Sequence, residues 1–151
     1  MNIRTASEVE IQDIIYTLRS EHMKWEDIDP DKSRFFVTTN QADSVVGFIR
    51  YEPGILNALL SSIFVYPNDI GYDNETIAQQ MVEHIEEIAR SSYRQKLVSF
   101  SATDGSVLED LGYAQVPVGE AILMVKETPQ GRWLFSDESR LFREIAWVKN
   151  I

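Results

Sequence analysis

The run Leu59-Leu60-Ser61-Ser62-Ile63-Phe64-Val65-Tyr66, followed by Pro67, is the strongest structural signal in this 151-residue chain. It is apolar almost throughout, which is typical of a strand buried on both faces of a sheet. Proline ends such a strand because it has no amide hydrogen to donate to a neighbour. The run therefore predicts a central strand over residues 59–66.

The segments after this strand predict a crossover to a second strand. Polar residues 68–73 lead to a long helix that starts near Asn74, and residues 97–100 have the composition of another strand. Four apolar residues recur in the helix at helical spacing: Ile77, Met81, Ile85 and Ile88. A strand, a helix and a strand in this order form a right-handed crossover with parallel strands.

The remaining segments predict a mixed α/β (α+β) sheet flanked by helices. On the N-terminal side, Ser7 and Glu10 form a capping box before a helix, and two strands over 34–39 and 44–51 form a hairpin. On the C-terminal side we expect a short helix over 104–110, strands over 113–116 and 120–126, and a terminal helix from Ser136 or Asp137.

Composition excludes several classes of function. The chain has 14 Lys and Arg against 24 Asp and Glu, a formal charge of −10, which argues against non-specific nucleic-acid binding. It has no cysteine, so thiol nucleophiles and Cys-ligated zinc are excluded, and its two histidines are far apart, so we expect no metal site. No apolar run approaches the length of a membrane span, and we expect a cytoplasmic protein.

Two motifs, together with the order of elements, resemble a known family. Ile63-Phe64-Val65-Tyr66-Pro67 and Leu108-Glu109-Asp110-Leu111-Gly112-Tyr113 are similar to segments of the GNAT superfamily of acyl-CoA-dependent N-acetyltransferases. The resemblance covers roughly residues 2–127. It implies a GNAT-like domain over 1–127, with 128–151 as a C-terminal extension that packs on the domain or on a second subunit.

The resemblance also implies that acetyl-CoA binds beside the central strand. Backbone groups of Ile63, Phe64 and Val65 on a splayed strand would hold the pantetheine arm and the thioester. Amides of the following loop and helix start would hold the pyrophosphate, which assigns this role to Asp69, Ile70, Gly71, Tyr72, Asp73 and Asn74. Gly71 matches a family glycine, but Asp73 and Glu75 replace small residues, and carboxylates repel a pyrophosphate.

Catalytic and acceptor residues follow from the resemblance in the same way. Glu52 and Ser62 are the candidates for the general base that takes a proton from the amine, although Glu52 also fits a plain surface residue. The acidic and aromatic trio Trp25, Glu26 and Asp27 falls where the family's substrate loop lies. It would hold a cationic amine, or it is a pair of surface acids beside a packed tryptophan.

Two functions remain open at this point. The first is an acetyl-CoA-dependent N-acetyltransferase that acts on a small amine or a protein amino group. The second is a GNAT-fold binding or regulatory protein that has lost affinity for CoA. The apolar tail predicts a homodimer, or packing of the tail on its own domain; its apolar residues are Trp133, Leu134, Phe135, Leu141, Phe142, Ile145 and Trp147.

Overall fold

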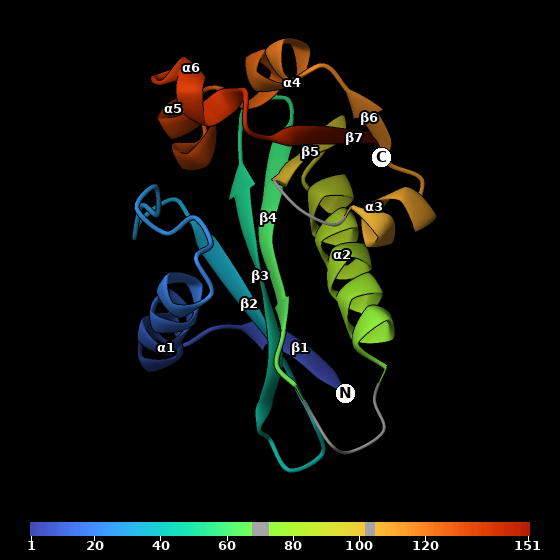
Figure 1. Cartoon of the computed structure of the whole chain (residues 1–151). Helices are drawn as coiled ribbons and strands as arrows, with labels where there is room; N and C mark the ends of the chain where they lie inside the picture. The colour runs from blue at the N-terminus through green and yellow to red at the C-terminus, as the bar shows by residue number, and fades with distance from the viewer. Residues whose placement is uncertain (68–72, 102–104) are drawn as a thin grey trace.

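The computed structural model describes residues 1–67, 73–101 and 105–151. In chain order its elements are β1 (Asn2–Thr5), α1 (Glu8–Ser20), β2 (Arg34–Thr39), β3 (Val45–Pro53), β4 (Ala58–Val65), α2 (Asn74–Ser91), β5 (Lys96–Ser101), α3 (Ser106–Asp110), β6 (Ala114–Val116), α4 (Val118–Val125), α5 (Pro129–Phe135), α6 (Glu138–Leu141) and β7 (Ile145–Asn150). Within these residues the strands form one sheet in the order β1-β2-β3-β4-β5-β7-β6 (Figure 1).

The sheet is mixed, as the sequence predicts. Neighbouring strands from β1 to β4 are antiparallel, β4 and β5 are parallel, and β7 is antiparallel to both β5 and β6. The parallel pair is joined by the long helix α2, so the predicted crossover is confirmed. The α1 capping box is also present: the Glu10 amide donates to Ser7 Oγ at 3.2 Å and the Ser7 amide donates to Glu10 Oε1 at 2.9 Å.

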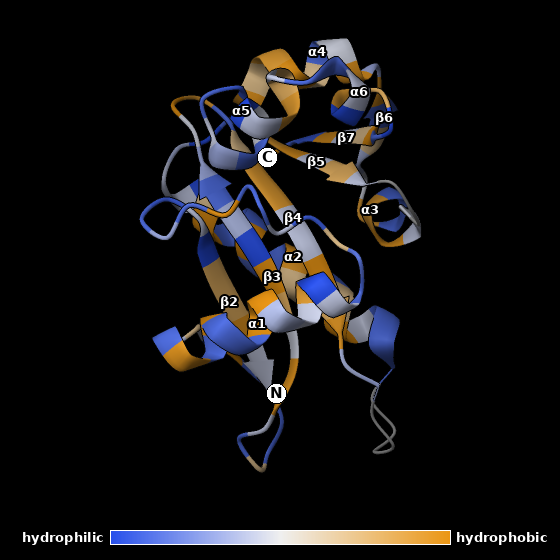
Figure 2. Ribbon diagram, turned by 60° about the vertical axis from the view of Figure 1, so that its left-hand side comes forward, coloured by the Kyte–Doolittle hydropathy of each residue, from blue (hydrophilic) through white to orange (hydrophobic). Residues whose placement is uncertain are grey.

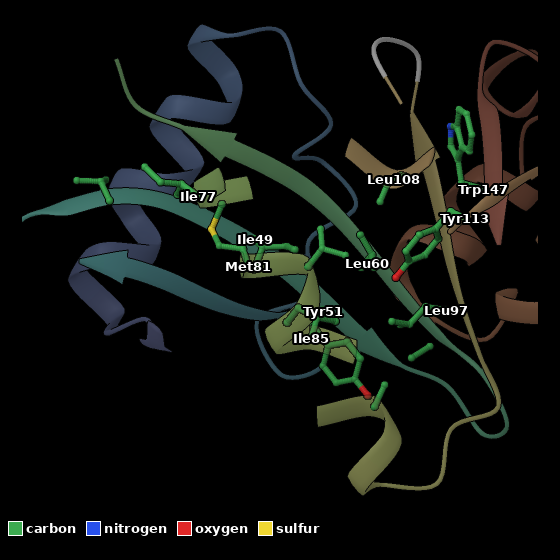
Figure 3. Packing of buried hydrophobic residues seen from close by; sticks show 14 residues of the cluster. Ile49, Tyr51, Leu60, Ile77, Met81, Ile85, Leu97, Leu108, Tyr113 and Trp147 are labelled. Carbon is green, nitrogen blue, oxygen red and sulfur yellow. The ribbon is translucent and has the colours of Figure 1, made fainter. Parts of the chain in front are cut away.

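Helices cover both faces of the sheet, which gives a layered molecule. On one face, α2 and α3 pack on a buried cluster that includes Ile49, Leu60, Met81 and Leu108 (Figure 3). On the other face, α1 buries Ile14 and Leu18 against β2 and β3, and α4, α5 and α6 pack against β5 and β7. Figure 2 shows hydrophilic and hydrophobic residues alternating along α1, as expected for a helix with one face on the sheet.

Two expectations about the C-terminal third are wrong. Residues 118–125, expected to contain a strand, form α4, because Ala121, Ile122 and Val125 recur at helical spacing and bury one side on the sheet. The expected terminal helix is the short α6 followed by strand β7. In β7, Ile145 and Trp147 contact the α2 side of the sheet, and Ala146 and Val148 contact the other side. This period of two is that of a strand and not of a helix.

Residues 128–151 therefore contribute to the sheet itself. They supply α5, α6 and β7, and β7 lies between β5 and β6. Of the apolar side chains in this tail, Leu134, Leu141 and Trp147 are buried in their own domain, whereas Phe135 and Phe142 stay exposed. Among the helices that the structure describes, none combines the length and apolar composition needed to cross a membrane.

Candidate functional site

Strands β4 and β5 begin as a pair and then separate. Ala58 pairs with Leu97 and Leu59 with Val98, and within the described residues the ladder between the two strands ends there. On its other edge β4 remains paired with β3 as far as Val65. The separation leaves a wedge between β4 and β5, in which the β5-facing edge of residues 60–65 has no strand partner among the residues described.

A bulge in β4 lies at the start of this wedge. The register with β3 shifts between Phe48 and Arg50, and Ser62 takes a left-handed backbone conformation with φ of 55°. An extra residue in one strand bends it and increases its twist. The bulge thus turns β4 away from β5 and brings the Ser62 side chain to the cavity described next.

A cavity of about 810 Å³ fills the wedge and passes through the sheet. Residues 61–65 of β4 and 99–101 of β5 form its sides. On the α2 face it is lined by the first turns of α2 and α3. On the opposite face it is lined by residues 21–24, Trp133, Arg140, Arg143 and Glu144. This volume is in the usual range for a small-molecule site.

Below the bulge lies a fully buried polar cluster centred on Arg50. Its Nη1 donates to Asp27 Oδ2 at 2.7 Å and approaches Glu52 Oε2 at 3.5 Å, and its Nη2 donates to the Lys24 carbonyl at 3.1 Å. Gln130 donates from Nε2 to Asp27 Oδ2 at 3.0 Å and from its amide to Glu52 Oε1 at 2.9 Å. The cluster ties the loop after α1 to β3 and to the start of α5.

Glu52 is buried and not a surface residue. Its side chain is 0% exposed, and Ser33 Oγ and the Gln130 amide donate to its two oxygens. Burial raises the pKa of the Glu52 carboxyl above its ordinary value, and the opposing charge of Arg50 offsets only part of this effect. Glu52 is also absent from the described residues that line the cavity.

Ser62 does line the cavity, but it is poorly suited to be a base. A hydroxyl oxygen has two acceptor lone pairs. Arg50 donates to Ser62 Oγ from both Nε, at 3.1 Å, and Nη2, at 2.9 Å. Both lone pairs are therefore engaged, and the Ser62 hydroxyl is left as a hydrogen-bond donor.

The expected acceptor loop is divided between the core and the surface. Trp25 is half-buried under the Arg19 guanidinium at 4.7 Å, Glu26 is exposed, and Asp27 is bound to Arg50. None of these three is among the described residues that line the cavity. The preceding residues 21–24 line it instead.

The expected CoA residues are brought together as far as the structure describes them. Ile63, Phe64 and Val65 line the cavity, and so does Asn74 at the start of α2. Asp73 is the exposed N-cap of α2, and its Oδ1 accepts from the Glu75 amide at 3.1 Å. The expectations for Asp69, Ile70, Gly71 and Tyr72 lie outside the described residues.

Several cavity residues were missed by sequence reasoning. Among them are Lys24 and four residues of the tail: Trp133, Arg140, Arg143 and Glu144. The tail was read as an extension, so its charged residues were not considered for the site. A period-two reading of residues 145–148 would have placed β7 in the sheet and Glu144 at its edge. Among the described residues, no group of three or more metal-ligating side chains is present.

The sequence matches no protein-family model and no curated protein. Solved structures do resemble it. N-acetylglutamate synthase from Neisseria gonorrhoeae, complexed with coenzyme A and N-acetyl-glutamate, has a TM-score of 0.74 at 15% identity, over 99% of this chain and 34% of that one. Rv2747 from Mycobacterium tuberculosis, in complex with CoA and NLQ, has a TM-score of 0.68 at 12% identity, over 100% and 99% of the two chains.

A third structure, aminoglycoside 6'-acetyltransferase type Ii, has a TM-score of 0.64 at 16% identity. The match covers 99% of this chain and 97% of that one. This chain thus spans about a third of the synthase and nearly all of the other two. The mixed sheet and its flanking helices define an acyl-CoA N-acyltransferase type of α/β fold. More particularly, the chain has the GNAT N-acetyltransferase fold.

Proposed function

We propose that the protein is an acetyl-CoA-dependent N-acetyltransferase that acts on a small amine or a protein amino group. The observation that carries this proposal is the wedge between β4 and β5, because it combines an unpaired strand edge with a cavity that crosses the sheet. An extended pantetheine arm carries amide groups, which can pair with a strand edge as a further strand does. Because fold alone does not establish activity, the proposal depends on the geometry of the site.

The donor would enter from the α2 face. Residues 63–65 would pair with the pantetheine arm, and the first amides of α2 would face the pyrophosphate, since a helix N-terminus attracts anions. Acetyl-CoA supplies an activated acetyl thioester. The Val65 amide would donate to the thioester carbonyl oxygen and stabilise the negative charge that develops there.

The acceptor would enter from the opposite face, and its ammonium group would lose a proton to water before it reacts as a neutral amine. Its nitrogen forms a bond to the acetyl carbon, the carbon–sulfur bond breaks, and the sulfur leaves with the electron pair. The amine proton passes to water in the open cavity. Because Arg50 occupies both lone pairs of the Ser62 hydroxyl, this hydroxyl would donate a hydrogen bond to the departing thiolate. If Ser62 gives up its proton, it would take another proton from water.

A calorimetric titration with acetyl-CoA, paired with an assay for thiol release, tests this function. We expect saturable binding and release of CoA in the presence of a suitable amine. Ser62→Ala should lower turnover while leaving acetyl-CoA binding unchanged, and Ser44→Ala, in an exposed turn far from the cavity, is the matched control. Binding without turnover for any amine would contradict the enzymatic part of the proposal.

One observation favours a second function, a GNAT-fold binding or regulatory protein that has lost CoA affinity. Asp73 already accepts the Glu75 amide, and Glu75 lines the cavity, so two carboxylates stand where a pyrophosphate would bind. Under this alternative, acetyl-CoA gives no heat of binding at millimolar concentration, and the double variant Asp73→Asn, Glu75→Gln restores it. Glu83→Gln, which removes an exposed charge elsewhere on α2, should have no effect.

A further inference from the structure

The geometry points to an acceptor that is a small amine bearing an anionic group, bound through the guanidinium groups of Arg140 and Arg143. This inference rests on the proposed function, because it assigns the acceptor to the cavity face opposite α2. An amino carboxylate is the simplest molecule of this kind, and an amino phosphate has the same chemistry.

Arg140 lies in α6, and Arg143 lies in the short segment that joins α6 to β7. Both arginines line the cavity on the face of the sheet away from α2, whereas Asn74 and Glu75 line it on the α2 face. Figure 1 shows α6 and α2 on opposite sides of the sheet. A donor whose phosphates lie at the start of α2 therefore leaves the arginine side of the cavity for the acceptor.

Arg140 is held in a fixed orientation. Its guanidinium stacks on the Trp133 ring at 4.1 Å, and its Nη1 donates to the Trp133 carbonyl at 3.4 Å. The nearest carboxylate, Asp137, is 3.5 Å from Nε and more than a third exposed, so water weakens that pair. A planar guanidinium held in this way presents its remaining N–H groups as a fork that fits carboxylate and phosphate oxygens.

Arg143 is exposed, and within the described residues its side chain makes no hydrogen bond or ion pair. Its five N–H donors are available for a ligand. Of the carboxylates on this face, Asp27 is bound to Arg50, and Glu144 accepts from Lys24 Nζ at 2.9 Å through Oε1, while its Oε2 has no hydrogen-bond partner among the described residues. Glu21 lies exposed at the rim, where its charge attracts the amino end of a zwitterion.

These contacts select against polycations. A polyamine would meet the two guanidinium groups of Arg140 and Arg143 on this face, and like charges repel. An anionic amine would instead gain charge-assisted hydrogen bonds from the arginines. Because Glu21 and Glu144 also line this part of the cavity, the acceptor that fits it carries a cationic and an anionic group.

Saturation-transfer NMR tests the inference without requiring turnover. The probes are pooled L-amino acids, the same amino acids as carboxamides, O-phosphoethanolamine, ethanolamine and spermidine. The proteins are the wild type, Arg143→Gln, Arg140→Gln and the control Arg34→Gln, which removes an exposed charge from β2 outside the cavity. Thermal unfolding of each variant establishes that it is folded, and acetyl-CoA binding is measured separately.

We expect an amino carboxylate or O-phosphoethanolamine to bind. The counterpart that lacks the anionic group, the carboxamide or ethanolamine, should bind at least about tenfold more weakly. Whichever of the two anionic amines binds identifies the anionic group. Arg143→Gln should abolish most of that preference, and Arg34→Gln should leave it intact. Equal or tighter binding of the carboxamides or spermidine, equal behaviour of the Arg143 and Arg34 variants, or no binding of any anionic amine at millimolar concentration would overturn the inference.

The outcomes separate this inference from the proposed function. If acetyl-CoA binds and no anionic amine does, the inference fails and the acetyltransferase proposal stands. If an anionic amine binds through Arg143 and acetyl-CoA does not, the acceptor site stands and the transferase proposal fails.

Discussion

The Arg50 guanidinium donates two hydrogen bonds to the hydroxyl of Ser62, from Nε at 3.1 Å and from Nη2 at 2.9 Å. Ser62 is the residue with left-handed backbone in the β4 bulge, and Arg50 is the residue at which the register of β3 resumes. The pair therefore links the buried polar cluster with the bulge at the start of the wedge. Removing Arg50 affects both the bulge and the cluster.

Arg50→Met should lower the free energy of unfolding by about 3–5 kcal/mol, because it leaves Asp27 and Glu52 buried without their cation. Urea denaturation measures the change. The triple variant with Asp27→Asn and Glu52→Gln removes the stranded charges and should recover part of the loss. Arg34→Met, at an exposed position in β2, should change stability by no more than about 0.5 kcal/mol. Equal effects at the two arginines would contradict this assignment.

Glu52 should make stability depend on pH. Burial raises the pKa of its carboxyl above the ordinary value of 4.5, so the folded chain keeps a proton that the unfolded chain has lost. The wild type therefore loses stability as pH rises from about 4.5 through the folded pKa. Glu52→Gln cannot ionise, so its stability relative to the wild type should rise over the same range.

Urea denaturation at several pH values between 4 and 8, on the order of one unit apart, measures this difference. Glu83→Gln, at an exposed position on α2, is the control and should show a difference that does not vary with pH. A constant difference for Glu52→Gln as well would show that its carboxyl titrates normally in the folded protein.

Glu10 should have the opposite pH dependence. A bidentate hydrogen bond from Arg4, with support from the Ser7 amide, lowers the pKa of the Glu10 carboxyl to about 2. Its stabilisation is present above the ordinary value of 4.5 and is lost as pH falls toward 2. Glu10→Ala should cost about 1 kcal/mol at neutral pH and less in acid, by thermal unfolding. Glu8→Ala is the matched control in the same helical turn; a pH-independent cost for Glu10→Ala would refute the prediction.

Trp147 should be essential for folding of the whole domain. It lies in β7 and is 8% exposed in the main core cluster, so Trp147→Ala should cost about 3–5 kcal/mol. Phe142, in the same tail but 69% exposed, should tolerate alanine with little change. A chain ended after Thr128 lacks β7 and should not unfold cooperatively in circular dichroism. A cooperative transition in that truncated chain would show that residues 1–128 fold alone.

Local patterns in the sequence predicted the parts of the fold that depend on neighbouring residues. The capping box at Ser7, the apolar stripe of α2 and the proline after β4 are local signals, and each corresponds to an observed helix or strand boundary within about a residue or two. The C-terminal third has short apolar runs, for which helical and strand spacing are hard to separate. Residues 118–125 and 145–150 were assigned wrongly for this reason.

The sequence indicated which strand backbone forms the candidate site, but it did not indicate most of the side chains that line the cavity. Residues 63–65 could be placed because the strand itself determines them. The burial of Glu52 had a local signal in the sequence. Phe48, Arg50 and Glu52 are two residues apart in β3 and therefore lie on the same face of the strand, which α1 and the residues around it cover. The pairing of Arg50 with Asp27 and Gln130, and of Lys24 with Glu144, joins segments far apart in sequence, and no pattern in a single chain reveals such contacts.

The proposed function requires that the separated edge of β4 binds the acyl-CoA arm. An NMR titration of isotope-labelled protein with acetyl-CoA tests this binding, because backbone amides report both binding and its location. We expect the amides of Ile63, Phe64 and Val65, together with those of residues 99–101 across the wedge, to shift in a saturable manner. Unchanged amides at these positions in millimolar acetyl-CoA, or shifts confined to other strands, would contradict it.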